Sequence, residues 1–232
     1  MMSLLPMDRL VSDILFGFTG LISIINPVGM AFVFLDRTSA LTEEARRLIA
    51  RRVAIYAFFV LMVAFFAGAP VLRFFGISIE ALRIGGGLAV AVAAWQMLNA
   101  PDTSLSGTAN ADTRRGDTDL VSHGAFFPLT MPLTTGPGSI ATAIALTASR
   151  GHYKLPTFLL SATASVVISV LVMVVIYLVY SRAARLAHYL GTNGTRVALR
   201  VSSFLLLCIG VQIILTGVQG FLAPIASLHG AG

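Results

Sequence analysis

The sequence predicts an all-α integral membrane protein with six transmembrane helices. Of its 232 residues, 56% are hydrophobic and 11% are charged, and the mean hydropathy is +0.87. Soluble domains carry roughly 25% charged residues, so a water-soluble or disordered chain is excluded, and the single cysteine excludes a disulfide-stapled fold. Six charge-free stretches reach the roughly 18 to 20 residues that a bilayer requires. They are residues 14–35, 53–72, 84–101, 120–149, 155–181 and 201–232.

The first stretch, 14–35, is expected to be a broken helix because it contains Asn26 and Pro27. Proline inside a helix removes a backbone donor and clashes with the preceding turn. The helix should therefore stop near Ile25 and restart at Pro27. Asn26 suits the restart as an N-cap, because its side chain accepts from a free backbone N–H and proline at the first helical position has no N–H to leave unpaired.

The second and third stretches are expected to be continuous helices. The second, 53–72, follows an arginine-rich segment, and the third, 84–101, begins just after Glu80 and Arg83. These two residues lie three positions apart on one helical face, which predicts an ion pair between them. The glycines at 85–87 are expected to let a neighbouring helix approach closely.

The fourth stretch, 120–149, is too long for one regular helix. Thirty residues at about 1.5 Å per residue would span about 45 Å, against a hydrocarbon core of about 30 Å. Within 128–139 the stretch also holds three prolines, two glycines and four hydroxyl residues: Pro128, Pro132, Pro137, Gly136, Gly138, Thr130, Thr134, Thr135 and Ser139. A break near mid-membrane is therefore expected here too.

The fifth and sixth stretches, 155–181 and 201–232, complete an even number of crossings, so both termini should lie on one side. Eleven of the sixteen Lys and Arg residues fall on the other side, after the first, third and fifth spans. The positive-inside rule makes that side cytoplasmic. For a bacterial inner membrane, the N- and C-termini would then be periplasmic.

The chain is expected to be a single membrane domain, 1–232, made of two three-helix halves. The segment 99–122 is rich in Asp, Thr, Ser and Gly and is expected to be a polar cytoplasmic linker. It separates a first repeat at 10–98 from a second repeat at 123–222.

Two motifs recur in the same order in the two halves. The break at Asn26-Pro27 is matched by Gly136-Pro137, offset by 110 residues, and the Ala-Leu-Arg sequence that ends at Arg83 is matched by the one that ends at Arg200, offset by 117. Because each half has an odd number of spans, the second half must enter the membrane upside down. The sequence therefore predicts an inverted repeat, with its first and fourth helices broken near mid-membrane.

Two broken helices related by a pseudo-twofold axis would bring two helix N-termini together near the midplane. The N–H groups of residues 28–30 and 138–140 would lack partners there and attract an anionic group, and the carbonyls of 22–25 and 129–134 would attract a cationic one. Such a site suits a zwitterion, and apolar walls favour an α-amino acid with a small neutral side chain. The predicted substrate-binding residues are Asn26, Pro27, Val28, Gly29, Thr134, Thr135, Gly136, Pro137, Gly138 and Ser139.

The remaining polar residues support fewer expectations. Arg83 and Arg200 are expected to reach the lipid headgroups, with gating or pairing, together with Glu80, as the alternative. The four histidines show no metal-ligand spacing, so neither a metal nor another cofactor is expected, and no pattern indicates nucleic-acid binding. All ten carboxylates lie outside the charge-free stretches. Their positions disfavour carboxylate-driven proton coupling and leave Na⁺ coupling or uniport open.

Three segments resemble the MarC family of six-span bacterial inner-membrane proteins, which includes the SnatA-type transporters of small neutral amino acids. They are ISIINPVGM at 22–30, LRIGGGLAVAVAAWQML at 82–98 and PLTMPLTTGPGSI at 128–140. The loop at 38–52 is also similar to the family's first cytoplasmic loop, whereas 99–122 cannot be matched residue by residue. The resemblance covers essentially the whole chain. It implies a transporter-like protein, with small neutral amino acids as the substrates of some members.

The expected function is a multi-pass transporter of small neutral amino acids that works by alternating access around the two breaks. A channel would need a continuous polar lining, and an enzyme would need a nucleophile with its base or metal inside the spans, so neither class is favoured and no catalytic residue is expected. The alternatives that stay open are another small solute and a structural or regulatory role. The expected partners are the lipid bilayer and a small-molecule substrate, without nucleic acid; the oligomeric state is open.

Overall fold

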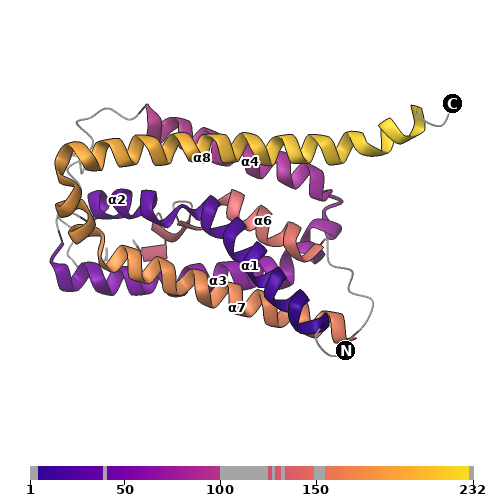
Figure 1. Cartoon of the computed structure of the whole chain (residues 1–232), viewed down its shortest axis with the longest axis horizontal. Coiled ribbons are helices and arrows are strands. Elements are labelled where there is room, and N and C mark those ends of the chain that lie inside the picture. Colours follow the sequence, from indigo (N-terminus) through magenta and orange to yellow (C-terminus); the bar gives the residue numbers. More distant parts are fainter. Residues whose placement is uncertain are drawn as a thin grey trace.

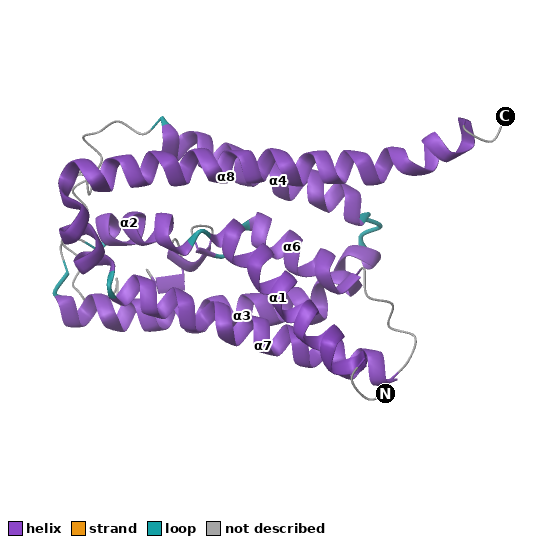
Figure 2. Ribbon diagram, viewed as in Figure 1, coloured by secondary structure: helices purple, strands orange, loops and turns teal. Residues whose placement is uncertain are grey.

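The computed structural model describes residues 5–38, 41–99, 125–126, 129–131, 134–148 and 155–229, and these ranges contain helices and no strand. Figures 1 and 2 show the helices running lengthwise in one bundle. The helices are α1 (Leu5–Ile25), α2 (Pro27–Arg37), α3 (Glu43–Phe74), α4 (Ile79–Leu98), α6 (Pro137–Ala148), α7 (Leu155–Ser181) and α8 (Ala183–His229).

Five segments of the described chain are long and apolar enough to cross a membrane. They are Met7–Leu35, which joins α1 and α2, then Glu43–Phe74, Ile79–Leu98, Phe158–Ser181 and Asn193–Ala223. They correspond to five of the six predicted stretches. The fourth predicted stretch contains α6, which is apolar but shorter. For the described ranges, the expectation of an all-helical chain with several helices that could cross a membrane is confirmed.

The helices begin where the sequence places capping residues. Thr42 accepts a hydrogen bond from the Ala45 N–H (3.3 Å) at the start of α3, and Ser78 accepts one from the Ala81 N–H (3.1 Å) at the start of α4. Both residues satisfy backbone donors that the first helical turn leaves without partners. α3 begins ten residues before its charge-free stretch, because arginines at a helix end can lie outside the bilayer without ending the helix.

Figure 1 shows that the first turns of α1 and the last turns of α8 lie at the same end of the bundle. The opposite end holds the C-terminal end of α2 and the N-terminal ends of α3 and α8. We call this opposite end the arginine-rich end, because it holds Arg37 of α2, the arginines of the start of α3 (Arg46, Arg47, Arg51 and Arg52), Arg185 of α8 and Arg182, which directly precedes α8. There, the Arg46 guanidinium donates to the carbonyls of Thr38 and Leu41, at 3.1 Å each, and so holds the α2–α3 connection.

α4 lies between α6 and α8 and reaches both through glycines. A β-carbon on Gly87 would come within 2.7 Å of the Gly210 carbonyl oxygen of α8, and one on Gly86 within 2.7 Å of Ala141 of α6. Lipid tails are as apolar as the side chains, so helix association in a membrane depends on such close van der Waals packing. The expected role of the glycines is confirmed for Gly86 and Gly87, whereas Gly85 faces open space.

Two expected features can be placed against these ranges. The predicted linker, 99–122, lies outside the described residues except for Asn99, whose N–H and side-chain amide both donate to the Trp95 carbonyl at the end of α4. The predicted ion pair between Glu80 and Arg83 is not formed. Glu80 instead lies against Gly220 of α8, because the close approach of α4 and α8 leaves its side chain beside that glycine.

The glycine contacts predict a difference between two neighbouring substitutions. Gly87→Ala should lower the thermal midpoint of unfolding in detergent by roughly 5 °C, because overpacking costs about 1–3 kcal/mol and backbone atoms surround the new methyl group. Gly85→Ala is the matched control. It should leave the midpoint unchanged or raise it slightly, because its methyl group meets nothing within 4 Å. Equal effects at both positions would contradict this account of the α4–α8 contact.

Candidate functional site

The first helix break is at Asn26, between the end of α1 at Ile25 and the start of α2 at Pro27, as the sequence predicts. Asn26 has a φ of +45°, a left-handed conformation that asparagine adopts more readily than most residues. Its side-chain oxygen accepts from the Gly29 N–H (3.3 Å), and its carbonyl accepts from the Met30 N–H (2.9 Å). Asn26 is therefore the N-cap of α2.

Asn26 also ties the break to α8. Its side-chain amide donates to the carbonyl of Ser202 (3.4 Å), and Gly29 packs so closely against Ser202 that a β-carbon would come within 2.7 Å of the serine Cβ. Pro27 and Gly29 are buried, whereas the Val28 side chain is 49% exposed.

The second helix break precedes α6, which begins at Pro137. Before it, three buried threonines each donate a hydroxyl to the carbonyl five residues earlier. The bonds are Thr130 to Ala125 (2.6 Å), Thr134 to Leu129 (2.7 Å) and Thr135 to Thr130 (3.2 Å). The Thr135 N–H also donates to the Thr130 carbonyl, at 2.9 Å, which is the wider winding of a π-helix. The hydroxyls thus satisfy carbonyls that the break would otherwise leave without donors.

The two breaks lie close together in space. A β-carbon on Gly138, in the first turn of α6, would come within 3.5 Å of the Ile24 side chain at the end of α1. On its other side it would collide with the Val90 side chain of α4. The first turn of α6 is therefore enclosed between α1 and α4, and only a glycine fits at this position.

Fewer backbone donors are free at the breaks than the sequence suggests. Of residues 28–30 and 138–140, four are already capped: Gly29 and Met30 by Asn26, and Ser139 and Ile140 by the Gly136 carbonyl (3.1 and 3.2 Å). The expectation of six free N–H groups is wrong, because local turns and the Asn26 side chain satisfy the others. Of these six N–H groups, only those of Val28 and Gly138 have no hydrogen-bond partner in the described chain.

The free carbonyls are likewise fewer than predicted. Those of Ile22, Leu129 and Thr130 accept hydrogen bonds from Asn26, Thr134 and Thr135. Those of residues 23–25 accept none from the described chain. The Ser139 hydroxyl donates to the Gly136 carbonyl (2.9 Å). Each of the four hydroxyls at the second break therefore already donates its proton to a carbonyl and can only accept a further hydrogen bond. The site combines two backbone donors with carbonyl and hydroxyl acceptors.

A buried aromatic cluster, which sequence reasoning missed, lies between the breaks and the arginine-rich end. Tyr180 of α7 stacks on Phe34 of α2, with ring centroids 4.8 Å apart, and its hydroxyl lies 3.0 Å from the Thr134 hydroxyl oxygen. Since the Thr134 proton goes to Leu129, Tyr180 is the donor in this bond. The signal in the sequence was the spacing of positions 161, 165, 169, 172, 176 and 180, all of which are buried on one face of α7.

Arg83, Arg200 and Glu80 lie apart from the breaks and from one another's side chains. Arg83 and Glu80, both partly buried, are in the first turns of α4 beside Gly217 and Gly220 of α8. Arg200 lies seventeen residues before Gly217 in α8, about 25 Å along the helix. The two arginines are thus brought to opposite ends of the α4–α8 pair. Within the described chain, no three His, Cys, Asp or Glu side chains are grouped to hold a metal ion.

Comparisons with known proteins place this chain among membrane proteins. Residues 11–222 match the family described as "MarC family integral membrane protein". The chain is 31% identical over 203 residues to the UPF0056 inner membrane protein MarC of Escherichia coli, with 87% of this chain and 92% of that protein covered. It is 32% identical over 204 residues to a UPF0056 membrane protein of Archaeoglobus fulgidus, with 87% and 90% covered. No solved structure matches.

The geometry of the first break predicts an order of stabilities at Asn26. Asn26→Ala should cost about 1 kcal/mol of unfolding free energy, because alanine loses the cap and is strained at positive φ. Asn26→Gly should cost less, since glycine tolerates this φ. Thermal unfolding in detergent measures the order, and an alanine variant as stable as the glycine variant would contradict the assigned cap.

The aromatic cluster predicts that removing the Tyr180 hydroxyl lowers the stability of the protein slightly. Tyr180→Phe removes the bond to Thr134 but keeps the stack on Phe34, so it should lower the unfolding free energy by about 1 kcal/mol. Tyr177→Phe is the matched control, three residues away with its side chain 39% exposed. Its unfolding midpoint should equal that of the unmodified protein, and an equal loss in both variants would contradict a specific role for the Tyr180 hydroxyl.

Proposed function

Because the chain belongs to the MarC family of integral membrane proteins, we propose that it is an inner-membrane transporter that moves small neutral amino acids by alternating access. The family shows an integral membrane protein, and the names of its relatives state a membrane location without an activity or a substrate. The substrate class is therefore argued from the site.

The pair of helix breaks is the observation that carries the proposal. The free N–H groups of Val28 and Gly138 are at the second helical position of α2 and α6, where the helix dipole favours a carboxylate. Nearby are the carbonyls of 23–25 and the lone pairs of the threonine hydroxyls, which suit an ammonium group. A membrane protein exposes unsatisfied backbone only where it lines a cavity or binds a solute. The site therefore matches the two charges of an amino acid.

An inverted repeat is the proposed basis of alternating access. If the two halves are equivalent, α2 corresponds to α6, α3 to α7 and α4 to α8. The contact of α3 with α6 then corresponds to the contact of α7 with α2, and the contact of α4 with α6 corresponds to the contact of α8 with α2. The contact of α1 with α7 corresponds to the contact of Phe126, which precedes α6, with Tyr56 of α3, where the rings meet edge to face (5.6 Å). This exchange symmetry supports two equivalent halves. Val28 and Gly138 are equivalent at the offset of 110 residues.

The proposed topology has six spans, with both termini outside. The start of α1 and the end of α8 lie at one end of the bundle, which requires an even number of crossings, and the segment that ends in α6 supplies the sixth. The arginine-rich end is then cytoplasmic. Arg83 and Arg200, which fall at opposite ends of the α4–α8 pair, are equivalent residues in this arrangement.

The decisive experiment is uptake of labelled alanine, glycine, serine and threonine into proteoliposomes, with and without a Na⁺ or proton gradient. The unmodified protein should accumulate or exchange at least one of them, and the effective gradient names the coupling ion. Asn26→Ala and Gly136→Leu should reduce uptake at least 10-fold, because each disturbs a helix restart.

The control for this experiment is Gly85→Ala, which lies on α4 but faces open space and should transport normally. If the folded, unmodified protein moves none of the four amino acids, amino-acid transport is refuted. If uptake occurs and both break variants retain it, the transport function stands but the site at the breaks is wrong.

A further inference from the structure

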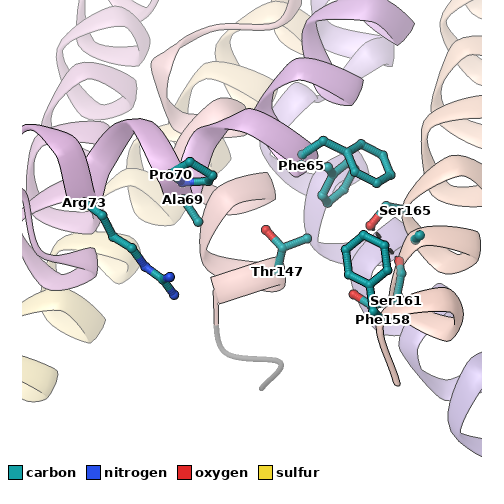
Figure 3. Close-up of a pocket in the computed structure, with 10 residues that line it drawn as sticks. Phe65, Ala69, Pro70, Arg73, Thr147, Phe158, Ser161 and Ser165 are labelled. Carbon is teal, nitrogen blue, oxygen red and sulfur yellow. Dashed lines mark hydrogen bonds between the residues drawn. The ribbon is translucent and has the colours of Figure 1, made fainter. Parts of the chain in front are cut away.

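A cavity lies away from the breaks, toward the end of the bundle that holds the termini. It has a volume of about 280 Å³ and lies between the C-terminal ends of α3 and α6 and the N-terminal end of α7. Figure 3 shows Arg73 on one side of the cavity, Phe65, Phe158, Ser161 and Ser165 on the other, and Thr147 between them. Pockets for drug-sized ligands have about 300–1,000 Å³, so this cavity suits a smaller solute.

Two of the three hydroxyls that line the cavity, those of Thr147 and Ser165, can act only as acceptors. Ser165 donates its proton to the Ser161 carbonyl (2.9 Å), and Thr147 donates its proton to the Ile144 carbonyl (3.0 Å). Both side chains are more than nine-tenths buried, at 1% and 4% exposed. Their remaining lone pairs can accept a hydrogen bond from an ammonium group. The other lining side chains are mostly aromatic or aliphatic.

Arg73 supplies the opposite charge. Its guanidinium has no hydrogen bond or ion pair with any residue in the described ranges. The sequence between α6 and α7 contains Arg150 and Lys154 and no carboxylate residue. An arginine at the rim of a largely apolar cavity, with no carboxylate partner in the described ranges, is suited to a carboxylate ligand, which it can bind through two parallel hydrogen bonds.

The arginine-rich end of the bundle has a counterpart of this cavity that is filled by side chains. In the proposed twofold arrangement, the counterpart of the cavity lies between α7, α2 and the N-terminal part of α3. That space is filled by the stacked rings of Phe34 and Tyr180, each only 2% exposed. One end of the bundle is therefore packed and the other is hollow, which is the asymmetry that alternating access requires.

We propose that the cavity is an outer binding station, where a small zwitterionic amino acid binds before it reaches the paired breaks. Arg73 binds the carboxylate, the hydroxyl oxygens of Thr147 and Ser165 accept from the ammonium group, and Phe65 and Phe158 contact the side chain. The proposal rests on the proposed function and adds to it a second site with its own residues.

Transport kinetics test the station first. Arg73→Ala should raise the KM for alanine about 10-fold or more and change the maximal rate less than twofold, since a charge-assisted hydrogen bond to substrate is lost outside the paired breaks. Arg73→Lys should restore part of the affinity. Arg51→Ala, an exposed arginine at the other end of the same helix, is the matched control and should leave KM unchanged. An unchanged KM in Arg73→Ala would overturn the role of Arg73.

A labelling experiment tests occupancy without relying on transport. Cys208 is the only cysteine, so Cys208→Ser with Ala69→Cys places one thiol in the cavity wall. Alanine added outside proteoliposomes should slow modification of this thiol by an anionic methanethiosulfonate at least threefold. Alanine methyl ester, which lacks the carboxylate, should not. Phe74→Cys in the same background is the control, because Phe74 is 85% exposed and does not line the cavity.

The outcomes separate the two proposals. Protection of the Ala69→Cys thiol by alanine supports the station, even if uptake fails and the transport function falls. Uptake that is abolished by Asn26→Ala, with no protection of the Ala69→Cys thiol, supports the paired breaks and overturns the station. Equal protection by alanine and its methyl ester would overturn recognition of the carboxylate.

Discussion

The structure depends on one constraint, which is that a backbone polar group inside hydrocarbon must find a hydrogen-bond partner or cost several kcal/mol. Breaking two helices near the middle of the chain's apolar spans creates a cluster of such groups. Asn26 caps one helix start, and the hydroxyls of Thr130, Thr134 and Thr135 cover the carbonyls before the other. The few groups that stay free, including the N–H groups of Val28 and Gly138, have no partner in the described chain and are available to bind a solute.

The features that sequence alone predicts are those set by local covalent chemistry. Proline at position 27 or 137 is favoured at the first helical position because it has no N–H, so the residues themselves predict both helix starts and the cap at Asn26. Pro70, which lies inside α3, shows that proline alone does not force a break. Charge-free length likewise predicts the apolar helices, because the cost of burying a charge in lipid does not depend on the fold. The same reasoning gives the start of α3 only approximately, since the absence of charge marks the part of the chain that lies in the hydrocarbon core and not the residue where the helix begins.

The features it misses depend on tertiary packing. A tyrosine near the end of an apolar stretch is typical of the lipid interface, yet Tyr180 is buried, with Phe34 of α2 stacked on its ring and Thr134 hydrogen-bonded to its hydroxyl. The pair of Glu80 and Arg83 fails because α8 comes closer to α4 than helix spacing alone implies. The sequence also predicts more free N–H groups than the structure has, because turns at the breaks pair N–H groups with carbonyls that no sequence pattern assigns.

The two free donors belong to the backbone, and this has a consequence for how the site can evolve. A substitution can alter a side chain but leaves the N–H in place unless the new residue is proline, so the anchor for a charged group is protected from most mutations. What mutation can reach is the wall around it, such as the half-exposed Val28 side chain or Val90, which presses against Gly138. A lineage built on this site could therefore change the size and shape of what it accepts while inheriting the same point of attachment.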